Sequence, residues 1–262
     1  MWQNLTLGRY YPGSSWLHDL DPRTKFVLGV LAMANLMWAE KWPALLLWFM
    51  VIAGVIFSTR IPPRFFAKNL RAFLWLFAIT IAIHALSDPA APRAEVWGIS
   101  ISWSGIVTGG KYALRLALLI LVAALLSFTT MPTDLTEGVE RILQPLRRWR
   151  VPVHEMAFMA SLALRFVPVI VDEAQRLQRA QMSRGARFEG NLLQRLQALV
   201  PMLVPLFVAT FNRADELAVA LAARCYEGGA RRVAYQEMVL RRQDWYAAMG
   251  VFVASLLTFV LN

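Results

Sequence analysis

Five long apolar runs constrain the fold of this chain more than any other feature. The runs occupy residues 26–39, 44–57, 72–86, 113–128 and 245–261. A soluble domain of 262 residues cannot hide so much apolar surface in its own core. Each run approaches the length that a helix needs to cross a bilayer. The sequence therefore predicts an all-α polytopic membrane protein with about five transmembrane helices.

Charged residues predict which side of the membrane the loops face. Loop 58–71 carries four cations and no acidic residue, the cations being Arg60, Arg64, Lys68 and Arg71. Cytosolic loops accumulate Lys and Arg, so this loop and the N-terminus are predicted to be cytosolic. The net charge of +10 is attributed to this topology rather than to nucleic-acid binding. Segment 87–105 is net negative and alternates Ile with Ser, which favours a short hairpin outside. Five crossings then place the C-terminus outside.

The character of the chain changes between residues 130 and 244. This stretch carries sixteen Arg and no Lys on a helical period, and long helices are predicted at 154–184 and 191–226. We therefore predict a membrane domain of about four spans at 1–129, a cytosolic helical domain at 130–244 and a final span at 245–262. Whether the two long helices enter the bilayer stays open.

Both long helices are predicted to end in a small residue, an arginine and a break. The first ends at Ser183-Arg184-Gly185, and the second at Ala223-Arg224-Cys225 with Gly228-Gly229 just beyond. A cation suits a helix C-terminus, and glycine allows the positive φ that turns the chain out of the helix. Either end alone has the composition of an ordinary helix terminus. Their repetition about 40 residues apart favours a functional role.

No catalytic or metal-binding pattern stands out. Residues 105–111 fit the first seven positions of a phosphate-binding loop, but Tyr112 stands where Ser or Thr should hold magnesium. We interpret this match as chance and expect no ATP site. His18, His84 and His154 lie far apart without ligands at helical spacing, so no metal or other cofactor is expected. Acid, base and nucleophile do not converge, and the chain is not expected to be an enzyme.

Six segments, in their order along the chain, carry a resemblance to a known family. Together they resemble the transmembrane T component (EcfT/CbiQ-like) of energy-coupling factor (ECF) transporters, which are ABC-type importers of vitamins and transition-metal ions. The chain departs from the family's Ala-Arg-Gly motif in having Ser183 in the first copy and Cys225 in the second. The segments are 15–25, 132–146, 164–168, 173–174, 181–186 and 214–226.

The resemblance implies a non-catalytic energy-coupling subunit in the plasma membrane of a prokaryote. Two partner ATPases would bind ATP and magnesium, and a membrane S component would bind the substrate. The region 130–244 would be the coupling domain, with Arg165 and Glu173 as structural or orienting residues. Residues implied to dock the ATPases are Ser183, Arg184, Gly185, Ala223, Arg224 and Cys225.

Alternatives remain at this stage. Within the family, the chain could be a shared component serving several S components, which we favour, or a dedicated one for biotin or cobalt. Outside the family, a self-sufficient secondary transporter would need a substrate site near the bilayer midplane and usually an inverted repeat. The sequence shows neither.

Overall fold

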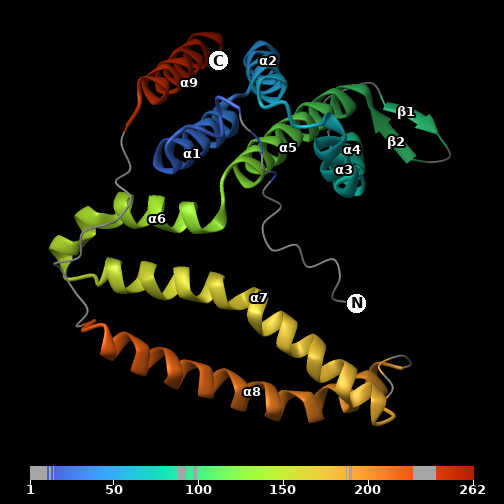
Figure 1. The fold of residues 1–262 in the computed structure, drawn as a ribbon. Helices are drawn as coiled ribbons and strands as arrows, with labels where there is room; N and C mark the ends of the chain where they lie inside the picture. Colours follow the sequence, from blue (N-terminus) through green and yellow to red (C-terminus); the bar gives the residue numbers. More distant parts are fainter. Residues whose placement is uncertain are drawn as a thin grey trace. The chain divides into compact units, whose positions relative to one another are not determined.

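The computed structural model describes residues 11, 13, 15–87, 93–96, 99–186, 188, 191–226 and 240–262. These residues fall into two compact units, one made of the described parts of 8–139 and 237–262, the other of those of 140–236. Figure 1 shows the helices of both units. The predicted all-α class is confirmed, with one two-stranded hairpin among the described residues. The functional division into membrane and coupling domains stays a prediction.

The first unit contains most of the elements. Its β1 and β2 pair antiparallel, as the alternation of Ile and Ser predicted. Helix α6 leads into the second unit. The second unit holds the 3₁₀ helix η1 (Gln144–Trp149), α7 (Val153–Ser183) and α8 (Leu192–Ala223). In order, the first unit has α1 (Pro22–Trp38), α2 (Trp42–Ser58), α3 (Pro63–Ala72), α4 (Leu74–Ser87), β1 (Arg93–Val96), β2 (Ile99–Ser102), α5 (Trp103–Thr129), α6 (Pro132–Leu143) and α9 (Arg242–Leu261).

Helices α1, α2, α5 and α9 share one apolar core. Leu36, Leu45, Trp48 and Leu118 are its largest fully buried side chains. The indole N–H of Trp48 donates to Thr258 Oγ1 at 2.9 Å and ties α2 to α9. An indole N–H buried in an apolar environment needs such an acceptor, so this bond orients the largest core side chain.

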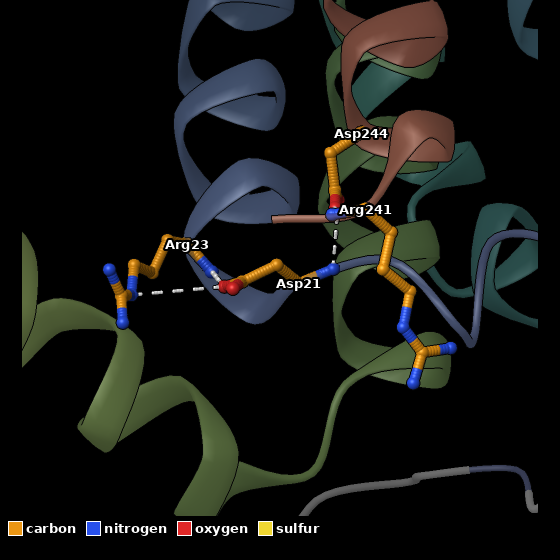
Figure 2. A network of polar contacts seen from close by, with 4 residues as sticks. All are labelled: Asp21, Arg23, Arg241 and Asp244. Carbon is orange, nitrogen blue, oxygen red and sulfur yellow. Dashed lines mark hydrogen bonds and ion pairs between the residues drawn. The ribbon is translucent and has the colours of Figure 1, made fainter. Parts of the chain in front are cut away.

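The start of α1 is held by a chain of helix caps (Figure 2). Asp21, directly before Pro22, is the N-cap residue, and its side chain accepts from the N–H of Arg23 at 2.9 Å. The N–H of Asp21 in turn donates to Asp244 Oδ1 at 2.9 Å. Asp244 Oδ2 accepts from the N–H of Arg241, the N-cap residue of α9, at 2.7 Å. One buried carboxylate thus joins two helix starts that lie far apart in the sequence.

Helices α4 and α5 pack closely through the glycines of the apparent phosphate-binding motif. A Cβ at Gly105 would overlap the backbone of His84, and one at Gly109 would lie 2.8 Å from the Cα of Ile81. Small residues spaced by four let two membrane helices approach this closely. The structure therefore gives Gly105 and Gly109 a packing role.

The set of helices long enough to cross a membrane differs in part from the predicted spans. By length and composition α5, α7, α8 (from Leu196) and α9 qualify, and the bent pair α3–α4 counts as a fifth if it is one span. The count is thus four or five, against about five predicted. Helices α1 and α2 have 17 residues each, about 25 Å, which is short of a hydrocarbon core of about 30 Å.

Candidate partner-docking site at two matched helix ends

The local sequence sets the limits of both long helices. Helix α7 begins after Pro152, and His154 Nδ1 lies 2.6 Å from Glu140 Oε1, which fixes the corner before it. Helix α8 begins with a capping box, in which the N–H of Asn191 donates to Gln194 Oε1 at 3.4 Å. Pro168 in α7, and Pro201 with Pro205 in α8, lie inside continuous helices.

The C-terminus of α7 is a Schellman motif centred on the first predicted arginine. The N–H of Gly185 donates to Met182 O at 3.0 Å, and that of Ala186 to Gln181 O at 3.0 Å. These are the two hydrogen bonds that define the motif. Arg184 is the C-cap residue, and Gly185 takes φ +87°, where a side chain would be strained.

The C-terminus of α8 repeats this arrangement bond for bond. The N–H of Cys225 donates to Ala222 O at 2.9 Å, and that of Tyr226 to Leu221 O at 3.1 Å. Arg224 is the C-cap residue with φ −92° and ψ 13°, against −89° and 7° at the end of α7. The two three-residue motifs are therefore one backbone structure present twice.

The second end differs from the sequence-based expectation in where the chain turns. Gly228-Gly229 was expected to supply the positive φ, but Cys225 does so with φ +53°. The reason is that the Schellman hydrogen bonds place the left-handed residue directly after the C-cap. Gly228 and Gly229 lie outside the described residues.

Tyr226, which the sequence analysis did not single out, anchors the second end. Its ring stacks on that of Phe158 near the start of α7, with centroids 5.0 Å apart. An apolar residue just past a Schellman turn commonly packs back in this way, and that rule could have identified it. The contact also shows that the end of α8 lies beside the beginning of α7.

The two matched ends consequently lie at opposite ends of the α7–α8 pair. The chain leaves α7 at Ser183 and enters α8 only nine residues later, so Arg184 is beside the start of α8. Helix α8 has 32 residues, a length of about 48 Å. Figure 1 shows the two helices running in opposite directions. Arg184 and Arg224 are thus held apart, one at each end of the pair.

Both arginines are available to a partner. Arg184, Gly185, Arg224 and Cys225 are exposed, and within the described part of the chain neither guanidinium has a hydrogen-bond or ion-pair partner. Each guanidinium stands where the last carbonyls of a helix concentrate partial negative charge. Its planar fork of donors suits a carboxylate on another protein.

The two orienting candidates are separated in the structure. Glu173 lines a groove of about 330 Å³ between α7 and α8 and lies 3.8 Å from Arg176 Nη1. Arg165 is exposed and does not line this groove. The groove is otherwise mainly apolar, with Thr210 and Arg213 as its other polar residues. Of the two candidates, only Glu173 therefore lies where α7 packs on α8.

Helix α8 presents an apolar face that its own unit does not cover. Leucines recur along it at helical spacing: Leu196, Leu199 and Leu203 are exposed, whereas Leu206 lines the groove. Val204 and Phe211 are 67% and 68% exposed. An apolar face of this extent indicates contact with lipid or with another protein.

Comparison with known proteins gives a consistent picture. The family described as Cobalt transport protein (CbiQ) matches residues 13–235. The energy-coupling factor transporter transmembrane protein EcfT of Acidaminococcus fermentans is 40% identical, covering 100% of this chain and 96% of its own. The EcfT proteins of Lacticaseibacillus paracasei and Bacillus subtilis are 39% and 37% identical, with 98% and 100% of both chains covered.

Proposed function

Because the chain belongs to the CbiQ/EcfT family of transporter membrane proteins, we propose that it is a non-catalytic subunit that transmits ATP-driven movement to substrate uptake. Two partner ATPases would hydrolyse ATP, and a separate membrane S component would bind a vitamin or a transition-metal ion. The chain itself is a multi-pass membrane component of an energy-coupling factor transporter.

The observation that supports this proposal is the duplicated helix end. Two Schellman turns with the same hydrogen-bond pattern, each exposing an arginine, lie at opposite ends of one helix pair. A single chain can therefore offer the same surface to two similar ATPases. Helices packed along their length can pass a displacement at one end to the other. Arg184 and Arg224 would make the main contacts, while Ser183, Gly185, Ala223 and Cys225 would shape the ends.

The proposal is tested by co-purification with two partner ATPases of the ABC type. We expect Arg184→Ala or Arg224→Ala to reduce recovery of the chain on a tagged ATPase, and the double variant to abolish it. A matched control replaces Arg147 and Arg179, two exposed arginines of the same unit, with alanine. Full recovery of a well-folded Arg184→Ala, Arg224→Ala variant would refute the docking role.

The single cysteine of the chain gives a second readout. Cys225 is exposed and lies directly after Arg224, so a maleimide should label it readily in the isolated protein. We expect the ATPases to protect it, with labelling slowed roughly tenfold or more, an occlusion equivalent to about 1.4 kcal/mol. Unchanged labelling in the assembled complex would place the ATPases elsewhere.

The apolar face of α8 is the surface that we propose for the S component. Leu203 and Val204 lie on it, 47% and 67% exposed. An aspartate in place of Leu203 would put a charge into an apolar interface, at a cost of several kcal/mol. We expect Leu203→Asp to lose the S component while retaining the ATPases. Recovery of all subunits would show that this face contacts only lipid.

We favour the shared type of subunit over one dedicated to biotin or cobalt. The chain aligns over its full length with EcfT proteins. Pull-down of the chain with more than one kind of S component would support sharing. Substrate uptake by the protein alone in lipid vesicles would instead favour a secondary transporter.

The proposed orientation places the start of α1 on the cytosolic side. Arg23 and Lys25 lie at this start, and Asp244 joins it to the N-cap residue Arg241 of α9. Clustered cations at one end of the membrane helices favour the cytosol there. Helix α9 would then run outward from this end to a C-terminus outside the cell.

A further inference from the structure

Helix α3 carries a row of cations on one face. Arg64, Lys68 and Arg71 recur at intervals of four and three, so they lie on the same side of the helix. All three are exposed, and so is Arg60 just before the helix. No acidic residue occurs between residues 58 and 71, so within this stretch nothing neutralises them. We call Arg60, Arg64, Lys68 and Arg71 the basic row.

The opposite face fixes where this helix lies. Phe66 is only 4% exposed, and its ring meets that of Phe128 edge-on at 5.3 Å. Phe128 belongs to the last turn of α5, and the next residue, Thr129, accepts a hydrogen bond from Lys25 Nζ at 3.1 Å. Helix α3 is therefore docked at the end of α5 where the charged start of α1 also lies.

The bend after α3 separates charged from apolar chain. Helices α3 and α4 meet at an angle of 52° with only Phe73 between them. Helix α4 is apolar and packs closely on α5, whereas α3 has a strongly charged face. Cations are costly in hydrocarbon, so α3 must lie in the headgroup region while α4 enters the membrane. Figure 1 shows α3 and α4 next to α5.

From this placement we infer that the basic row is a binding site for anionic phospholipid headgroups. The phosphate of such a lipid is negatively charged and would neutralise the positive charge of the basic row. Arginine can bind a phosphate with two parallel hydrogen bonds. Phe65, exposed beside Arg64, is placed to enter the interface next to the acyl chains. An amphipathic basic helix at a membrane surface is the expected form of such a site. The inference requires insertion in the membrane but not the coupling role.

Native mass spectrometry of the purified chain tests the inference. The protein in mild detergent is titrated with phosphatidylglycerol or phosphatidylcholine of identical acyl chains, and bound lipids are counted. We expect the anionic lipid to be retained preferentially. Replacing Arg64, Lys68 and Arg71 with glutamine should lower its occupancy by about tenfold. The charge-conserving double variant Arg64→Lys, Arg71→Lys should keep most of the binding, because the charge is retained.

The control removes the same charge elsewhere. Arg147, Arg148 and Arg150 are three exposed cations around η1 of the second unit, and their glutamine variant should bind anionic lipid within about twofold of the native chain. Equal loss in both variants would show that only bulk charge matters and would overturn the site. Equal retention of the two lipids by the native chain would also overturn it. Millimolar glycerol phosphate should not displace the lipid, since the acyl chains are part of the ligand.

Discussion

At the scale of single residues, the two helix ends differ most at the position after the arginine. Gly185 adopts φ +87° at no steric cost, whereas Cys225 adopts φ +53° with a Cβ in place. A non-glycine residue in this region costs roughly 1 kcal/mol. The arginines could be located from sequence because a cation before a break is typical of helix ends. The strain at Cys225 could not be located from sequence, because Gly228-Gly229 nearby is an equally suitable place for the turn.

Exchanging the two turn residues should have opposite effects on stability. We expect Cys225→Gly to relieve the left-handed strain and to stabilise the second unit by about 0.5–1 kcal/mol, and Gly185→Cys to destabilise it by about 1 kcal/mol. Thermal unfolding in detergent, followed by tryptophan fluorescence, measures both shifts. A loss of stability in Cys225→Gly would mean that the thiol makes a contact that outweighs the strain.

At the scale of elements, the apolar runs located most helices but not every break. The run at 72–86 predicted one span, and the structure has α4 there, separated from α3 at Phe73. No proline or glycine lies at this break, and Phe66 just before it is held against Phe128 of α5, a contact between distant parts of the chain that sequence patterns do not reveal. Residues 105–111 resembled a phosphate loop because close helix packing also selects glycine.

Two adjacent glycines of α5 allow a matched test of that packing. A Cβ at Gly109 would meet the backbone of α4 at 2.8 Å, whereas one at Gly110 would have nothing within 4 Å. We expect Gly109→Ala to destabilise the protein by about 1–3 kcal/mol. Gly110→Ala should be neutral or stabilising by up to about 1 kcal/mol, since alanine favours the helix. Equal thermal shifts in the two variants would contradict the close contact.

At the scale of the whole molecule, the first unit is closed by contacts between the beginning and the end of the chain. Asp244 is 3% exposed and accepts hydrogen bonds from the backbones of Asp21 and Arg241. Asn262 Oδ1 accepts from the N–H of Glu40 at 2.7 Å, which joins α9 to the α1–α2 turn. Sequence patterns identify a helix cap on its own helix, but they do not reveal a carboxylate shared between two helices. The all-α class followed from composition, whereas this closure required the structure.

Removing the shared carboxylate should loosen the first unit. Asp244→Ala leaves the buried N–H of Asp21 and the partly buried N–H of Arg241 without an acceptor, and we expect a loss of about 2–4 kcal/mol and poor recovery from detergent. Asp244→Asn keeps one acceptor oxygen and should lose less. Asp215→Ala, at an exposed position of α8, is the control and should melt like the native chain. Native stability in Asp244→Ala would show that other contacts hold α9 in place.

The matched helix ends also have a consequence for binding strength. Two equivalent epitopes joined by a spacer of fixed length act together, because binding of the first raises the effective concentration of the second. This avidity holds only when the span between the ends equals the span between the two receiving sites. Spacer length then becomes a determinant of specificity in its own right. Deleting one full turn from the middle of α8 would leave both arginines intact, yet remove the bivalent advantage.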